Sequence, residues 1–180
     1  MPIIHYANSS EGVQPRPNDH RLQKNWRRVA EIIPPDSLPV SLMPVLPGLY
    51  RSNLPFPQQF NALSELGIRH IIALTECRAL YTQAIKDGDL PENITVHHTP
   101  YNQRRFLTLQ ELVKLVKMIH TARQDGAVLV HCIAGMTRTG LTVSAYIAAI
   151  LAHEPLDGFD SMTGVGHLLR RWYDFVTISG

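Results

Sequence analysis

The stretch from Ala127 to Gly140, AVLVHCIAGMTRTG, decides the fold of this chain. Its first four residues are apolar, as in a buried strand, and a helix-like apolar run from Leu141 to Leu151 follows it. The sequence therefore predicts a strand, a tight loop and the start of a helix, in that order.

The predicted loop begins with a nucleophilic cysteine, Cys132, and ends with an arginine, Arg138. Five residues separate the two. This spacing allows one ring of inward-pointing backbone N–H groups beside the unpaired N–H groups of the following helix, and such a ring binds a tetrahedral anion. The helix dipole and the N–H groups lower the pKa of Cys132, and Arg138 grips two phosphate oxygens with its planar fork. We therefore expect phosphate transfer to the sulfur.

The signature His131-Cys132, five residues, Arg138-Thr139 resembles that of the cysteine-dependent protein tyrosine phosphatase superfamily. The run from Gly48 to Pro55, GLYRSNLP, and the turn Leu66-Gly67-Ile68 into a strand ending at Glu76 resemble its dual-specificity branch. The resemblance covers residues 46 to 178. It implies a shallow site that accepts phosphoserine, phosphothreonine and phosphotyrosine, with a phosphorylated protein or another phosphate-bearing substrate as partner.

The resemblance also implies a role for each residue of the signature. Cys132 forms a thiophosphate intermediate, Thr139 donates a hydrogen bond to its sulfur, and His131 orients the cysteine. Gly135 supplies a backbone conformation forbidden to larger residues, and Gly140 permits close helix packing. The phosphate is held by the N–H groups and side chain of Ile133, Ala134, Gly135, Met136, Thr137 and Arg138. The loop carries no lysine, which weighs against inositol lipids as substrates.

The chain departs from the family where relatives keep the aspartate that protonates the leaving group. That position is Gln103, and a second family variant places the acid at Tyr101; no Asp or Glu occurs between Thr99 and Gln110. Three alternatives stay open. An acid comes from Glu76, Asp87, Asp89 or Glu111; the substrate is a phosphoanhydride, as for RNA 5′-triphosphatases; or the protein binds phosphorylated partners and turns them over poorly. Gln103 could also position water, and Arg104 and Arg105 could attract an anion.

Two further motifs contain residues that can form redox or metal sites. Cys77 follows the second predicted strand, where some relatives keep a cysteine that traps the oxidised nucleophile as a disulfide, so it is a candidate redox partner of Cys132. His97 and His98 are adjacent, and neighbours on a strand face opposite sides, so we predict no metal site there. No cofactor is expected.

From Leu46 onward, short β-rich runs alternate with amphipathic helices, which predicts an α/β sheet with helices on its faces. With the resemblance, this gives a single α/β domain whose central sheet is mostly parallel. Residues 1–45 are expected to form a proline-rich extension with one helix, at about His20 to Ile33, and residues 46–180 the phosphatase domain. Predicted strands lie near 48–51, 69–74, 94–98 and 127–131. Predicted helices cover Gln58 to Leu66, the run after the cap Thr108, residues 139 to 152 and residues 166 to 177.

The charge and the cysteine content bear on location and partners. A net charge of +2 over 180 residues gives no argument for nucleic acid, which would be a partner only under the RNA triphosphatase alternative. No apolar stretch is long enough to span a membrane, and we find no secretory signal. Two cysteines, one of them in a reactive loop, suit a reducing compartment, so we expect a cytoplasmic protein without membrane contact.

Overall fold

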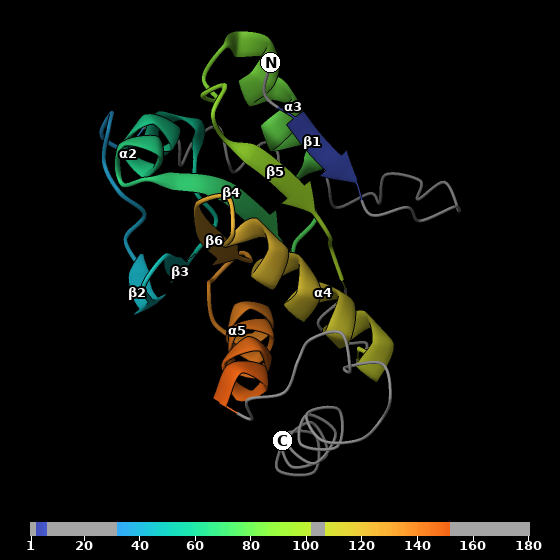
Figure 1. The fold of residues 1–180 in the computed structure, drawn as a ribbon. Coiled ribbons are helices and arrows are strands. Elements are labelled where there is room, and N and C mark those ends of the chain that lie inside the picture. Colours follow the sequence, from blue (N-terminus) through green and yellow to red (C-terminus); the bar gives the residue numbers. More distant parts are fainter. Residues whose placement is uncertain (1–2, 7–31, 102–106, 152–180) are drawn as a thin grey trace.

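The computed structural model describes residues 3–6, 32–101 and 107–151, and the structural statements below concern these residues. They form one sheet with helices on both of its faces (Figure 1). The predicted α/β architecture is therefore confirmed.

The sheet has six strands in the described residues, in the order β1-β5-β4-β6-β3-β2. All neighbouring strands are parallel except β2 and β3, which form an antiparallel hairpin. The bounds are Ile3–Tyr6 for β1, Met43–Leu46 for β2, Leu49–Ser52 for β3, Ile68–Ala73 for β4, Thr95–His98 for β5 and Ala127–His131 for β6.

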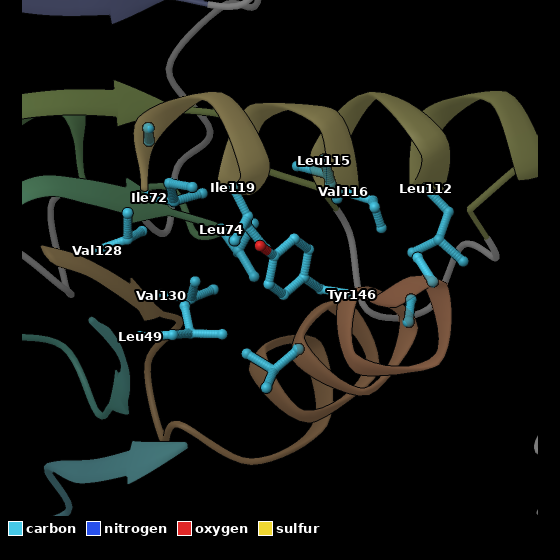
Figure 2. Close-up of a cluster of buried hydrophobic side chains, with 14 of the residues drawn as sticks. Leu49, Ile72, Leu74, Leu112, Leu115, Val116, Ile119, Val128, Val130 and Tyr146 are labelled. Carbon is cyan, nitrogen blue, oxygen red and sulfur yellow. The ribbon is translucent and has the colours of Figure 1, made fainter. Parts of the chain in front are cut away.

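Four helices and one short 3₁₀ helix surround the sheet in this part of the chain. They are η1 (Pro57–Gln59), α2 (Phe60–Glu65), α3 (Arg78–Asp87), α4 (Leu109–Ala122) and α5 (Thr137–Leu151). On one face, α4 and α5 bury residues such as Leu112, Val116 and Tyr146 against Ile72 and Val130 of the sheet (Figure 2). On the other face, α2 and α3 bury a second cluster that includes Phe60, Leu63 and Tyr81.

Local sequence explains the start of α4. The hydroxyl oxygen of Thr108 accepts from the Glu111 N–H at 3.2 Å, and the Thr108 N–H donates to the Glu111 carboxylate at 2.8 Å. This reciprocal capping box satisfies two N–H groups that the first turn of a helix leaves without partners. Thr108 is the predicted cap, and Leu112, Leu115, Val116 and Ile119 lie on the buried face of the helix that follows it.

The predicted strands from residue 48 onward agree with β3, β4, β5 and β6 to within about one residue, and three predicted helices correspond to η1–α2, α4 and α5. Helix α5 begins at Thr137, two residues earlier than expected, so Arg138 lies in its first turn. Most of the predicted helix at 20–33, and all of the one at 166–177, lie outside the described residues.

Three observed elements were not predicted: β1, β2 and α3. Strand β1 lies inside the expected N-terminal extension, yet it joins the sheet by parallel pairing of Ile3–Tyr6 with Thr95–His98 of β5. Strand β2 begins at Met43, before the predicted domain boundary. The division at residues 45 and 46 stays a prediction, but at least one segment of the extension belongs to the main sheet.

The parallel register fixes where a site can form. Ala73 of β4 pairs with both His98 of β5 and His131 of β6, and Ser52 of β3 pairs with His131. The carboxyl ends of four strands therefore meet at one edge of the sheet, which is where open α/β sheets bind ligands. None of the helices in the described residues is long and apolar enough to cross a bilayer.

Candidate active site

The loop between β6 and α5 leaves this edge of the sheet at Cys132 and enters the helix at Thr137 (Figure 1). Its backbone carbonyls are held by donors that come from outside the ring. His131 Nδ1 lies 3.1 Å from the Cys132 carbonyl oxygen, so this nitrogen carries the proton and donates. The Leu54 N–H donates to the Ile133 oxygen at 3.0 Å, and the Arg51 guanidinium donates to the Gly135 oxygen at 3.0 Å.

These three bonds decide the direction of three N–H groups. In a trans peptide the C=O and N–H bonds point in opposite directions, and the described residues contain no cis peptide. Because the carbonyls of Cys132, Ile133 and Gly135 are held by those outside donors, the next N–H groups point the other way, into the ring. These are the N–H groups of Ile133, Ala134 and Met136.

Gly135 is required at its position for two reasons. Its φ is +72°, a left-handed conformation that side-chain-bearing residues rarely adopt. A Cβ there would also lie 2.5 Å from the Ser52 carbonyl oxygen and 2.7 Å from the Asn53 nitrogen, at the end of β3. The expected conformational role of Gly135 is confirmed. The expectation for Gly140 is wrong, because a Cβ built there meets nothing within 4 Å, so no close packing depends on this glycine.

The Cys132 thiol has a lowered pKa. Burial alone would raise the pKa, but the hydroxyl and N–H of Thr139, the N–H of Gly135 and the charge of Arg138 together lower it below the ordinary value. The Thr139 side chain is fully buried, and its hydroxyl has no hydrogen-bond partner of its own within the described residues, although it contributes to lowering the pKa of Cys132. A hydrogen bond from Thr139 to the Cys132 sulfur stays a prediction.

The Arg138 guanidinium donates hydrogen bonds to two backbone carbonyls. One terminal nitrogen donates to the Leu74 oxygen at 3.1 Å and to the Tyr101 oxygen at 3.3 Å. The Tyr101 hydroxyl donates in return to the Arg138 carbonyl at 3.0 Å. The Arg138 Nε is buried and has no partner in the described part of the chain. A buried donor without an acceptor is costly, so an anion in the ring would supply what this nitrogen lacks.

His131 connects the loop to α3. Since its Nδ1 donates to the Cys132 carbonyl, its Nε2 is the unprotonated nitrogen and accepts from the Tyr81 hydroxyl at 2.8 Å. Burial lowers the pKa of His131 to about 4, which keeps this tautomer neutral around pH 7. The Tyr81 ring stacks on Phe60, with the ring centres 5.6 Å apart. A helix that sequence analysis did not predict thus fixes the orientation of the His131 ring.

The general acid is not supplied by any described residue between Thr99 and Gln110, and Gln103, Arg104 and Arg105 lie outside the described residues. Burial raises the pKa of Tyr101 to about 12, and its proton is already donated to a carbonyl. The Glu111 carboxylate is bound in the capping box, and Asp87 ends α3, about 15 Å along the helix from Cys77. Asp89 comes after that end.

Of the four carboxylates named from the sequence, Glu76 follows most closely the strand end whose backbone binds Arg138. It is exposed and follows Leu74, whose carbonyl binds Arg138. It therefore stays a candidate acid.

Cys77 is a free, fully buried thiol whose pKa is raised, first by burial and then by the charge of Glu76. It packs in the cluster on the α2–α3 face, whereas Cys132 belongs to the α4–α5 face. A disulfide between them stays a prediction, and a raised pKa disfavours thiolate chemistry at Cys77.

His97 and His98 lie on opposite faces of β5, as expected from their adjacency: His98 is buried and reaches the Thr75 carbonyl at 3.1 Å, whereas His97 contacts His70 at 3.1 Å. Within residues 3–6, 32–101 and 107–151, no group of three His, Cys, Asp or Glu side chains could hold a metal ion.

Sequence reasoning missed four residues that build the site: Arg51, Leu54, Tyr81 and Tyr101. Each acts through a backbone carbonyl or a ring nitrogen of the signature, so no pattern within the signature points to it. Arg51 and Leu54 lie in the run from Gly48 to Pro55 that resembles the dual-specificity branch, which was the available signal.

Comparison with known proteins identifies the family. The family model for the DSP-PTPase phosphatase of polymorphic toxin systems matches residues 47–152. The chain belongs to this family. It is thus a member of the cysteine-dependent protein tyrosine phosphatase superfamily, on its dual-specificity side.

Individual relatives are more distant. A probable dual specificity protein phosphatase of Dictyostelium discoideum is 30% identical over 104 residues, covering 57% of this chain and 24% of that protein. Dual specificity protein phosphatase 22 of Mus musculus is 28% identical over 113 residues, covering 59% of this chain and 54% of that protein. The chain therefore spans about half or less of the length of these curated relatives.

Solved structures share the fold. A putative phosphatase of Shewanella putrefaciens has a TM-score of 0.54 at 16% identity, covering 91% of this chain and 95% of that one. The catalytic core of the phosphatase SIW14 of S. cerevisiae has a TM-score of 0.52 at 21% identity, covering 76% and 78%.

Proposed function

We propose that this protein is a cysteine-dependent phosphatase that hydrolyses phosphomonoesters of proteins through a thiophosphate intermediate at Cys132. The observation that carries the proposal is the ring itself. A thiol of lowered pKa lies beside N–H groups that outside bonds turn inward and beside an arginine with an unpartnered buried Nε. This combination suits a tetrahedral dianion above a nucleophile.

The reaction has two displacements. In the first, the Cys132 sulfur forms a bond to phosphorus, the bond between phosphorus and the leaving oxygen breaks, and that oxygen takes the electron pair. In the second, water attacks phosphorus, the bond to sulfur breaks, and the thiolate returns with release of inorganic phosphate. The inward N–H groups and Arg138 hold the equatorial oxygens in both steps. The Thr139 hydroxyl stabilises the thiolate as it leaves.

The missing acid affects which ester is cleaved well. Without a proton donor the leaving oxygen departs as an anion, and a phenolate, with an ordinary pKa of about 10, leaves far more readily than the alkoxide of serine or threonine. We therefore place phosphotyrosine ahead of phosphoserine and phosphothreonine as substrate. A proton from Glu76 would remove this preference.

One observation favours a second candidate. The stretch from Thr99 to Gln110 holds no carboxylate, and a phosphoanhydride needs none because its leaving phosphate is stable without a proton. An RNA 5′-triphosphate or an inositol pyrophosphate is a substrate of this kind. Poor turnover of bound phosphoproteins is the third reading.

A substrate panel separates these possibilities. The protein is assayed with peptides carrying phosphotyrosine, phosphothreonine or phosphoserine, with an inositol pyrophosphate and with an RNA 5′-triphosphate. We expect the highest kcat/KM for phosphotyrosine. A clear preference for either anhydride would replace the main proposal with the second, and tight phosphopeptide binding to a protein that hydrolyses no probe would replace it with the third.

A further inference from the structure

Four large apolar side chains are exposed around the loop that binds the phosphate. They are Val40, Met43, Ile133 and Met136, with exposed fractions of 99%, 54%, 43% and 68%. We refer to these four residues as the apolar rim. Ile133 and Met136 belong to the loop itself, whereas Val40 and Met43 precede it by some ninety residues in sequence.

Hydrogen bonds and strand register bring the two halves of the rim together. Met43 pairs with Arg51 across the β2–β3 hairpin, so the two side chains project from the same face, and that of Arg51 reaches the Gly135 carbonyl at 3.0 Å. Met43 therefore lies on the face of the hairpin from which Arg51 reaches the loop.

The segment that holds Val40 is fastened to the same place. Next to Val40, the Ser41 hydroxyl donates to the Asn53 side-chain oxygen at 2.9 Å and accepts from the Asn53 N–H at 2.7 Å. The residue after Asn53 donates to the Ile133 carbonyl. The segment of residues 40–43 is thus tied through Asn53 and Leu54 to the backbone of Ile133.

The rim carries little charge. Ala134 and Thr137, the other exposed side chains of the loop, are neutral. Arg51 is partly buried and bound to Gly135. The described lysines, Lys86, Lys114 and Lys117, lie on α3 and α4 and not in the loop or the β2–β3 hairpin. Among the described residues of the loop and the β2–β3 hairpin, a substrate rich in phosphates would meet no cationic side chain other than Arg51.

We propose that the apolar rim binds the apolar side chains that flank the phosphorylated tyrosine of a peptide substrate. This proposal rests on the phosphatase function proposed above and names its substrate class. The surface is continuous with the phosphate-binding loop, so a peptide whose phosphate enters the ring must run across or beside it. Burying exposed apolar side chains is favourable, whereas an acidic or polyphosphorylated neighbour would lose hydration against the four apolar side chains of the rim.

The test uses the full chain and three probes: a small aryl phosphate, a phosphotyrosine peptide with leucine, isoleucine and valine around the tyrosine, and the same peptide with aspartate and glutamate in their place. We expect kcat/KM to be about tenfold higher for the apolar peptide, as expected from covering one apolar side chain. Met43→Glu and Val40→Glu should remove that advantage and leave the rate on the aryl phosphate unchanged.

Leu66→Glu is the matched control, because Leu66 is 39% exposed but lies before β4, at the opposite edge of the sheet. It should change none of the three rates. Met43→Leu should keep the preference, which excludes a general effect of altering β2. If Met43→Glu does not fold, Val40→Glu tests the rim alone, since that side chain is fully exposed.

The outcomes separate the two proposals. If the aryl phosphate is hydrolysed and the two peptides are hydrolysed at equal rates, the proposal for the apolar rim is wrong and the proposed phosphatase function stands. If no probe is hydrolysed, the proposed phosphatase function is wrong. The proposal for the apolar rim is then tested by measuring how tightly both peptides bind to Cys132→Ser protein, and equal affinities contradict it. An RNA 5′-triphosphate turned over faster than either peptide would also overturn it.

Discussion

Arg51 on β3 donates a hydrogen bond to the backbone carbonyl of Gly135 at 3.0 Å, across 84 positions of sequence. The bond does not touch the reacting atoms. It turns the peptide between Gly135 and Met136 so that the Met136 N–H faces the ring, and it ties the loop to the edge of the sheet. A residue outside the signature thus positions part of the phosphate-binding backbone.

Replacing Arg51 with methionine should weaken anion binding, because the Gly135 carbonyl loses its outside donor. We expect the Kd for inorganic phosphate, measured with Cys132→Ser protein, to rise about tenfold, in line with loss of a charged hydrogen bond of about 1.5 kcal/mol. Arg51→Lys should recover part of the affinity. Arg69→Met is the control, because Arg69 also donates to backbone carbonyls. These are the carbonyls of Ser64 and Ile68, which lie at the opposite edge of the sheet from the loop. Equal losses in both variants would mean that Arg51 acts only on stability.

Gly135→Ala should disable the site, because the added Cβ meets the Ser52 backbone and the φ of +72° is unfavourable for alanine. We expect the free energy of unfolding in urea to fall by about 1–3 kcal/mol and phosphate binding to be lost. Gly140→Ala lies in open space inside α5 and should raise stability by up to about 1 kcal/mol with activity retained. Full activity in Gly135→Ala would contradict the geometry of the loop.

Thr139→Val should raise the pKa of Cys132, because the hydroxyl that stabilises the thiolate is lost. Less thiolate is then present at any pH below the new pKa, so the midpoint of iodoacetamide alkylation moves upward. A hydrogen bond to a charged group of about 1.5–3 kcal/mol corresponds to a shift of about one to two pH units. Thr142→Val, a buried threonine one turn further along α5, should leave the midpoint in place. An unshifted midpoint for Thr139→Val would show that the Thr139 hydroxyl does not stabilise the Cys132 thiolate.

Gln103→Asp should restore a proton donor if Gln103 occupies the family's acid position. Turnover of phosphotyrosine should then rise more than that of activated aryl phosphates, by up to about 10²–10⁴-fold, so the dependence of rate on leaving-group pKa flattens. Gln110→Asp adds the same charge at an exposed position of α4 and should not change the slope. A wild-type slope that is already flat would show that an acid exists, and Glu76→Gln should then steepen it.

Much of this arrangement could be predicted because it is local in sequence. The spacing of Cys132 and Arg138, the apolar run of β6 and the Thr108–Glu111 cap each depend on residues within a few turns of chain. Helix α3 could not be predicted from such signals, because its N-cap, Cys77, makes no side-chain capping bond. Strand β1 depends on pairing with β5, some ninety residues away, and a short strand among prolines has no distinctive pattern of its own.

The sequence indicates the reactive residues of the site but not the residues that hold them in place. Cys132, Arg138, Thr139 and Gly135 belong to a signature whose chemistry requires those residue types. Tyr101 and Arg51 contribute contacts to main-chain carbonyls, which any sequence contains. Only the folded structure shows that the Tyr101 hydroxyl donates to the Arg138 carbonyl while the Arg138 side chain donates to the Tyr101 carbonyl.

The central claim is that Cys132 carries the phosphoryl group between the two displacements. It is tested most directly by mixing the protein with an aryl phosphate, quenching in acid within the first turnover and mapping the modified residue by mass spectrometry. The account predicts one phosphoryl group on Cys132, and none in Cys132→Ser protein, which should keep binding phosphate. A phosphoryl group on another residue, or more than about a tenth of the wild-type rate in Cys132→Ser, a loss far smaller than removal of a nucleophile causes, would contradict it.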